Sequence, residues 1–225
     1  MPTLTRDGAI FTLNLGDDEN RFNPPWVEAV TAALDEVEAA TGPKALVTTA
    51  TGKFWSNGLD LAWIGEHLEE AQAFVDSVHE LFARQLLLAA PSVAAIQGHS
   101  FAAGAMLAQA HDFRVMRADR GFWCTPEVDI FIPFTPGMAA LLQARLPVNT
   151  AHEAMTTGQR YGGAAAVEAG IVQAAEPEEN VLARATEIAA GLAEKDANTL
   201  GRIKARMYGH VADVLRDTHA NRLGE

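Results

Sequence analysis

Short apolar runs of strand type alternate with apolar residues at helical spacing along most of the chain. The strand-like runs are residues 3–6, 9–15, 44–50, 92–96, 112–116 and 121–124, and the helical ones are residues 24–40, 66–89, 101–110 and 137–145. The first two runs flank Asp7-Gly8, a dipeptide suited to a type I′ hairpin turn. From about Glu178 onward the pattern is helical throughout. This order predicts an α/β fold built from successive ββα units.

The helix expected over residues 101–110 differs from the others because it is apolar nearly all round and rich in alanine and glycine. Such a helix is normally buried, and its small side chains let neighbouring backbone approach closely. We find no linker and no internal repeat of 20–50 residues. Residues 1–175 are therefore expected to form the α/β core. Residues 176–225 are expected to form a helical region of the same domain that contacts other subunits.

Composition narrows the classes of protein and of partner. A chain of 225 residues with 48% hydrophobic residues has the composition of a soluble globular protein. The net charge of −12 disfavours binding to nucleic acid or to an anionic membrane, but not to a phosphorylated small molecule. The single cysteine, Cys124, and an N-terminal stretch without the apolar run of a signal peptide predict a cytoplasmic protein.

Several common kinds of site are not supported by the sequence. No two histidines stand at positions i and i+4 with an acid between them, so we expect no metal site. The chain has neither a phosphate-binding loop of the Walker type nor the dinucleotide fingerprint G-x-G-x-x-G. It also lacks the G-x-S-x-G of an α/β-hydrolase nucleophile. We expect no metal and no redox cofactor.

Three segments carry the candidate chemistry, and together they resemble the crotonase (enoyl-CoA hydratase/isomerase) superfamily. They are Phe54-Trp55-Ser56-Asn57-Gly58-Leu59-Asp60-Leu61, Ile96-Gln97-Gly98-His99-Ser100-Phe101-Ala102-Ala103-Gly104-Ala105, and Pro126-Glu127-Val128-Asp129-Ile130. Their order and spacing are similar to those of the family, and the pattern is closest to that of Δ3,Δ2-enoyl-CoA isomerases. The resemblance implies the crotonase fold, a coenzyme A thioester as substrate, and assembly as a homotrimer or a dimer of trimers.

The resemblance also implies a role for each site residue. The backbone N–H groups of Leu59 and Ala103 would hold the enolate oxygen of the thioester, and Glu127 would move the proton. Two preorganised N–H donors can each contribute about 3–4 kcal/mol of transition-state stabilisation. Substrate contacts are expected from Ser56, Gly58, Asp60, Gly104, Met106 and Phe131.

Two positions refine this interpretation. Hydratases of the family carry a second glutamate inside the small-residue helix, and Met106 stands in that place here. Because a single carboxylate suffices to move a proton from C2 to C4, the expected reaction is isomerisation of a 3-enoyl-CoA to the 2-trans-enoyl-CoA. Phe131 stands where relatives generally have glycine, and we expect it to reshape the acyl pocket. Asp129, two residues after Glu127, would share its face if the segment were extended.

Other interpretations of the same residues stay open at this point. Gly58 also suits an ordinary turn, residues 102–105 suit a tightly packed core helix, and Glu127 suits a surface cap. An enoyl-CoA hydratase, a hydrolytic member of the superfamily and an acyl-CoA-binding protein without catalysis are the alternative functions.

Overall fold

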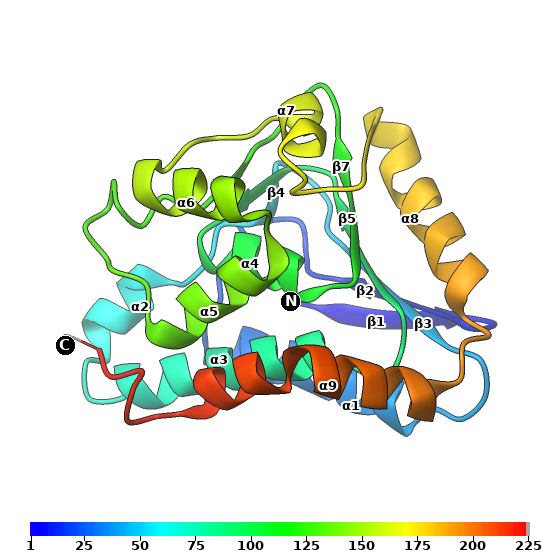
Figure 1. Cartoon of the computed structure of the whole chain (residues 1–225), viewed down its shortest axis with the longest axis horizontal. Coiled ribbons are helices and arrows are strands. Elements are labelled where there is room, and N and C mark those ends of the chain that lie inside the picture. The colour runs from blue at the N-terminus through cyan, green and yellow to red at the C-terminus, as the bar shows by residue number, and fades with distance from the viewer. Residues whose placement is uncertain (224–225) are drawn as a thin grey trace.

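The computed structural model describes residues 1–223 of the chain. Its larger sheet has six strands in the order β1-β2-β3-β5-β7-β9, and all neighbours run parallel except the β1–β2 hairpin (Figure 1). The strands are β1 (Thr3–Asp7), β2 (Ile10–Asn14), β3 (Ala45–Thr49), β5 (Ser92–Ile96), β7 (Phe113–Arg117) and β9 (Ala174–Glu176). The predicted α/β class is confirmed.

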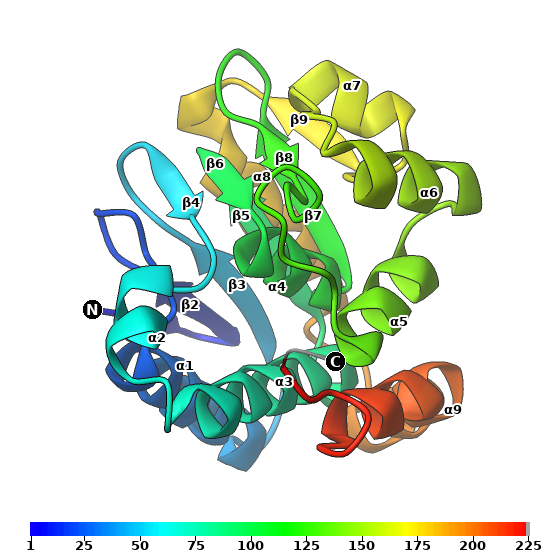
Figure 2. The same ribbon diagram turned by 90° about the vertical axis from the view of Figure 1, so that its left-hand side faces the viewer.

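A second, smaller sheet consists of three parallel strands in the order β4-β6-β8 (Figure 2). They are β4 (Phe54–Ser56), β6 (His99–Phe101) and β8 (Trp123–Cys124). Because parallel strands point the same way, the segments that follow them emerge at one edge of this sheet. All three motifs of the sequence lie at that edge.

Helices cover both faces of the larger sheet. The helices of residues 1–223 are α1 (Pro24–Ala39), α2 (Leu61–Glu66), α3 (Ala71–Leu87), α4 (Ala103–Ala110), α5 (Pro136–Arg145), α6 (Val148–Thr157), α7 (Gly163–Glu168), α8 (Glu178–Leu192) and α9 (Ala197–Arg216). The main core joins α1, α3 and α4 to one face of the sheet, and every residue of α4 is buried, as its composition predicts. α8 covers the other face (Figure 1), where Val181, Ala185 and Ala189 pack on β3, β5 and β7.

The structure differs from the sequence-based prediction at two places. The helix expected over residues 66–89 is shorter than predicted, because α3 starts only at Ala71. Before it lies a separate helix, α2, which the periodicity did not predict and which Asp60 caps by accepting a hydrogen bond from Trp63 N–H. Leu68, inside the expected range, lies between the two helices and is 72% exposed. The hairpin is present, but its turn is one residue later than predicted, because Asp7 still pairs with Ile10.

The C-terminal helix α9 lies along α3 and α5 and is tied to the sheet by a buried amine. The Lys204 side chain is 3% exposed, and its Nζ donates to the carbonyl oxygens of Leu88 at 2.8 Å and Ala90 at 3.0 Å. It also forms an ion pair of 2.7 Å with Asp112, whose carboxylate in turn accepts from the backbone N–H of Ser92.

Among residues 1–223, no helix is long and apolar enough to cross a membrane. The division at residue 175 and the subunit contacts of the helical region stay predictions.

Replacing Lys204 by alanine should lower the free energy of unfolding by about 3 kcal/mol, because it leaves two buried carbonyls and a half-buried carboxylate without their shared donor. The exposed Lys195 is the matched control, and Lys195→Ala should change stability by less than about 0.5 kcal/mol. Urea unfolding followed by circular dichroism measures both. Equal stabilities of the two variants would contradict the structural role of Lys204.

Candidate active site

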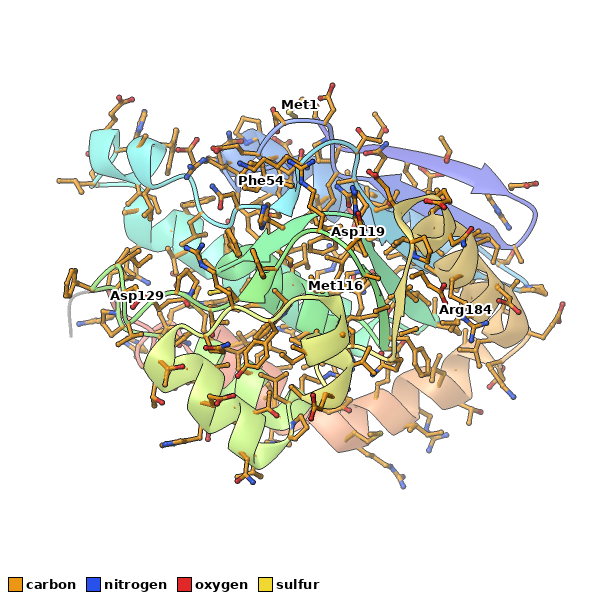
Figure 3. The ribbon with its side chains drawn as sticks, turned by 90° about the horizontal axis from the view of Figure 1, so that it is seen from above. Met1, Phe54, Met116, Asp119, Asp129 and Arg184 are labelled. Atoms are coloured by element: carbon orange, nitrogen blue, oxygen red, sulfur yellow. The ribbon has the colours of Figure 1, made fainter. Side chains whose placement is uncertain are left out.

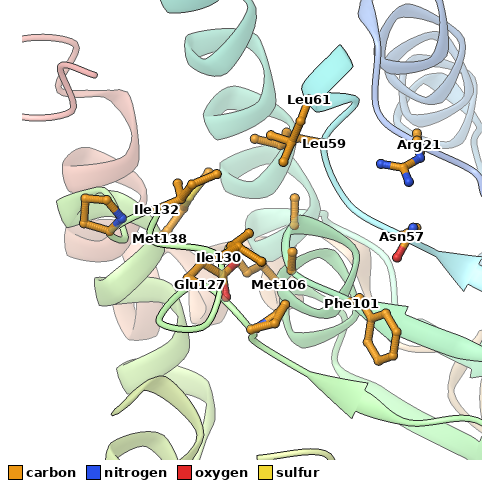
Figure 4. A pocket seen from close by; sticks show the side chains of 14 residues that line it. Arg21, Asn57, Leu59, Leu61, Phe101, Met106, Glu127, Ile130, Ile132 and Met138 are labelled. Carbon is orange, nitrogen blue, oxygen red and sulfur yellow. The ribbon is translucent and has the colours of Figure 1, made fainter. Parts of the chain in front are cut away.

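A cavity of about 200 Å³ opens at the edge of the smaller sheet where the three strands end. It is lined by Arg21, Asn57, Leu59, Leu61, Phe101, Ala102, Ala103, Met106, Pro126, Glu127, Ile130, Ile132, Pro133 and Met138. Figure 4 shows Glu127, Met106 and Ile130 gathered on one side and Arg21 and Asn57 apart from them. The lining is apolar except for Arg21, Asn57, Glu127 and backbone groups.

The strand ends explain why Leu59, Ala103 and Glu127 meet. Leu59 follows the last residue of β4 by three positions, Ala103 follows β6 by two, and Glu127 follows β8 by three. Since β6 lies between β4 and β8, Ala103 comes from the strand in the middle. Ligand sites of open α/β sheets lie outside the carboxyl ends of the strands, and this cavity follows that rule.

Glu127 is a buried carboxylate in apolar surroundings. Its side chain is 6% exposed, and Oε2 has no hydrogen-bond partner among the described residues. Burial raises the pKa of Glu127 from 4.5 to about 7, because the charged form is poorly solvated there. A carboxylate with this pKa and a free oxygen is suited to take up and return a proton near neutral pH.

A compact turn holds Glu127 in place. The N–H groups of Asp129 and Ile130 both donate to the Pro126 carbonyl, and the N–H of Ile132 donates to the Glu127 carbonyl at 3.1 Å. Asp129 is therefore on a turn and not on an extended segment, and it is exposed, at one end of the molecule in Figure 3. The expectation that Asp129 shares the face of Glu127 is wrong for this reason.

Leu59 presents a backbone N–H that no group in residues 1–223 accepts. The neighbouring strand-like contact explains this: Phe22 N–H donates to the Gly58 carbonyl, and Asp60 N–H donates to the Phe22 carbonyl, each at 2.8 Å. Leu59 lies between these two bonds, so its own N–H is directed away from Phe22. Leu59 also lines the cavity.

Ala103 presents a second N–H without an acceptor in the described chain. It is the first residue of α4, so no preceding helical turn supplies a carbonyl to accept from it. The dipole of the helix adds favourable potential for negative charge at this end. Ala102, just before it, has φ 50° and ψ −125°, a backbone conformation normally taken by glycine. Its N–H donates to the Cys124 carbonyl at 3.0 Å, which fixes the start of α4 to β8.

Two glycines let the loop that carries Leu59 approach the start of α4, which carries Ala103. A Cβ on Gly58, whose φ is +80°, would lie 3.1 Å from Ala103 N and 3.0 Å from the Ala102 Cβ. A Cβ on Gly104 would lie 2.7 Å from both the Cβ and the carbonyl oxygen of Ser56. Glycine at both positions is therefore needed for the observed distance between the loop after β4 and the start of α4.

The structure places the predicted site residues in two groups. Glu127, Leu59, Ala103 and Met106 line the cavity. Ser56, Gly58, Asp60, Gly104 and Phe131 do not belong to its described lining. The buried hydroxyl of Ser56 donates to the Asn20 carbonyl and accepts from Gly58 N–H, so it supports the loop from behind.

Phe131 is the prediction that differs most from the structure. Its side chain is 92% exposed, whereas we expected it to shape the acyl pocket. Its φ of +58° lies in the left-handed region, which glycine adopts more readily than phenylalanine. The turn directs the ring away from the cavity, and Ile130 and Ile132, on either side of it in the chain, line the cavity instead.

Two lining residues, Pro133 and Met138, lie outside the three motifs and were not indicated by the sequence. Asn57 and Leu61 lie inside the first motif, although no role was assigned to their side chains. Met138 carries no local signal, because it comes from the first turn of α5. Among residues 1–223, no group of three or more His, Cys, Asp or Glu lies so as to hold a metal ion.

Comparison with known proteins gives the class of the chain. The model of the enoyl-CoA hydratase/isomerase family matches residues 6–223. Over 228 residues the chain is 34% identical to enoyl-CoA delta isomerase 2, peroxisomal, of Arabidopsis thaliana, with 96% of this chain and 95% of the relative covered. Enoyl-CoA delta isomerase 3 of the same plant is 34% identical over 234 residues, covering 99% and 98%.

A solved structure agrees with these relatives. The crystal structure of an enoyl-CoA hydratase from Mycobacterium marinum superposes with a TM-score of 0.87 at 27% identity, covering 96% of this chain and 94% of that one. The chain belongs to the enoyl-CoA hydratase/isomerase family, the crotonase superfamily that its motifs resemble. The similar proteins include both isomerases and a hydratase.

Proposed function

We propose that the protein is an enoyl-CoA isomerase that moves the double bond of a 3-enoyl-CoA to the 2-trans position. The observation that carries this proposal is the cavity with Glu127 as the one carboxylate of its described lining, next to two unused backbone N–H donors. The two Arabidopsis relatives, both named as enoyl-CoA delta isomerases, support the same reaction.

The reaction uses these groups in two steps. The Glu127 carboxylate removes a proton from C2, and the electrons of that C–H bond form an enolate whose charge lies mainly on the thioester oxygen. The N–H groups of Leu59 and Ala103 donate to this oxygen and lower the energy of the enolate. Protonated Glu127 then delivers its proton to C4, the double bond forms between C2 and C3, and the carboxylate is regenerated.

Met106 favours isomerisation over hydration. Addition of water requires one group to activate the water and another to manage the proton. Met106 is 1% exposed and lines the cavity where a second acid would be needed. Its side chain makes this wall apolar, so a water molecule there would lack hydrogen-bond partners.

The test is an assay of two reactions with the same enzyme preparation. Formation of conjugated thioester from trans-3-hexenoyl-CoA reports isomerisation, and loss of the conjugated absorbance of crotonyl-CoA reports hydration. We expect turnover in the first assay and at least about 10²-fold less in the second. Faster hydration than isomerisation would favour a hydratase, and binding without either reaction would favour a hydrolytic or a non-catalytic role.

The pH dependence follows from the state of Glu127. The free enzyme needs the carboxylate, and its pKa is about 7, so kcat/KM should rise with a midpoint near that pH and level off above it. The folded protein binds this proton more tightly than the unfolded chain, so the contribution of Glu127 to stability falls as the pH rises from 4.5 to about 7. A profile of kcat/KM from pH 5.5 to pH 8.5 measures the midpoint. A flat profile would contradict the assignment of Glu127 as the base.

Three further expectations belong to this proposal. Coenzyme A enters as part of the substrate, and the reaction needs no metal or redox cofactor because the proton transfer is carried by Glu127. Assembly as a homotrimer or a dimer of trimers is expected from the family resemblance. The single buried cysteine favours a reducing compartment such as the cytoplasm, whereas one of the two Arabidopsis isomerases is named as peroxisomal.

A further inference from the structure

We propose that Met138 closes the apolar end of the cavity and limits the substrates to short acyl chains. This inference rests on the proposed function, because it assumes that the cavity holds the acyl part of a coenzyme A thioester. Met138 was not among the residues that the sequence indicated, and it follows the last residue of the third motif by eight positions.

The cavity has a polar end and an apolar end. Arg21 and Asn57 supply the polar side chains on one side, and Ile132 and Met138 lie on the other (Figure 4). Glu127 lies between the two groups in the same view. A thioester whose reacting carbons face Glu127 would thus direct its charged coenzyme A portion towards Arg21 and the end of its acyl chain towards Met138.

Burial divides the apolar lining into an exposed rim and a buried interior, to which Met138 belongs. Leu61, Ile130 and Ile132 are 43%, 42% and 39% exposed, so they form the rim of the cavity. Met138 is 7% exposed and belongs to the main core. The chain end would therefore meet Met138 inside the protein, where lengthening the acyl group requires the wall to move.

The backbone around Met138 is held from two sides, so this wall is rigid. The Met138 N–H donates to Thr135 Oγ1, which also contacts Nε2 of the buried His79 at 2.9 Å. The N–H of Gly137 donates at 2.7 Å to Oδ1 of Asn221, a fully buried side chain. The Asn221 amide in turn donates to the carbonyls of Val214 at 2.7 Å and of residue 217 at 2.8 Å, so the start of α5 is fixed to the end of α9.

The space behind this wall is also filled. A Cβ on Gly137 would lie 2.9 Å from the Leu215 Cα, which shows how closely the first turn of α5 packs on α9. The cavity volume of about 200 Å³ lies below the ~300–1,000 Å³ of common small-molecule sites. Such a volume suits the reacting part of the thioester and a few further carbons, which is why we infer a short chain.

The experiment measures binding of saturated coenzyme A thioesters, which have no double bond to move. Affinities for butanoyl-, hexanoyl-, octanoyl- and decanoyl-CoA are determined by calorimetry for the wild type, Met138→Ala, Leu61→Ala and Met155→Ala. Met138→Ala removes Cγ, Sδ and Cε from the wall. Met155, a partly buried methionine of α6 outside the described lining, is the matched control.

We expect the wild type to bind hexanoyl-CoA at least about tenfold more tightly than decanoyl-CoA. Met138→Ala should raise the affinity for decanoyl-CoA relative to hexanoyl-CoA by at least about tenfold, and Met155→Ala should leave that ratio unchanged. Met138→Val, which shortens the side chain with less loss of packing, should shift the ratio in the same direction if the alanine variant does not fold.

Two outcomes would overturn the inference. One is a ratio of decanoyl-CoA to hexanoyl-CoA affinity that stays at its wild-type value in the folded Met138 variants. The other is a change of this ratio in Leu61→Ala and not in the Met138 variants, since the acyl chain would then leave the cavity across the rim. Failure of the proposed function is a separate result: it would appear as absence of turnover on trans-3-hexenoyl-CoA, while the chain-length series with saturated thioesters would still report on Met138.

Discussion

Glu127→Gln should lower kcat for isomerisation of trans-3-hexenoyl-CoA by about 10³- to 10⁴-fold while leaving substrate binding nearly unchanged. Glutamine has almost the same shape as glutamate and keeps the lining of the cavity unchanged, but it cannot accept the C2 proton. The uncharged side chain also suits its buried position, so the free energy of unfolding at pH 8 should not fall, since the wild type has to bury a carboxylate there. Steady-state kinetics and urea unfolding measure the two effects.

Asp129→Asn is the control for this variant. It makes the same chemical change two residues away, on a side chain that is exposed and outside the described lining of the cavity. Its activity should stay within about twofold of the wild type. A loss of activity in Asp129→Asn similar to that in Glu127→Gln, or full activity in Glu127→Gln, would show that Glu127 does not carry the proton.

Gly58→Ala should lower kcat by about 10²- to 10³-fold, because the new Cβ would lie 3.0 Å from the Phe101 carbonyl oxygen and 3.1 Å from Ala103 N. The loop after β4 and the start of α4 would have to separate, and both N–H donors would leave their common position. The same crowding should lower the free energy of unfolding by about 1–3 kcal/mol. The loss of kcat with little change in KM is the kinetic signature of an interaction made mainly in the transition state.

Gly42→Ala separates crowding from backbone strain. Gly42 has φ +79°, against +80° for Gly58, but a Cβ there would meet no atom within 4 Å. It should therefore lower the free energy of unfolding by only about 1 kcal/mol and leave kcat unchanged. If both variants lost stability but neither lost activity, the donor pair would not depend on Gly58.

The sequence predicted most of the framework because its signals were local. The hairpin, the alternation of strands with helices and the all-round apolar α4 depend on turn residues and periodicity that lie within a few positions of one another. The three motifs also indicated Leu59, Ala103 and Glu127, and the end-of-strand positions explain why residues so far apart in sequence line one cavity. Their catalytic roles stay predictions until the variants are measured.

The missing parts depend on long-range packing. The separate helix α2, capped by Asp60, and the start of α3 at Ala71 were not visible in a periodicity that continues through Leu68. Phe131 was assigned to the pocket because the family resemblance implies glycine at this position, and only the left-handed turn shows that the ring leaves the cavity. Met138 was missed because its position depends on the hydrogen bond from the neighbouring Gly137 N–H to Asn221, more than eighty residues later in the chain.

The use of peptide N–H groups has a consequence for how this enzyme can be studied. An alanine scan would report nothing at Ala103, which is alanine already, and little at Leu59, whose contribution does not come from its side chain. The scan would instead give its signals at Gly58 and Gly104, which lie outside the described lining of the cavity but allow the close approach of the two donors. In a comparison of many sequences the enolate site would accordingly be visible through its glycines, while the donor residues themselves are free to vary.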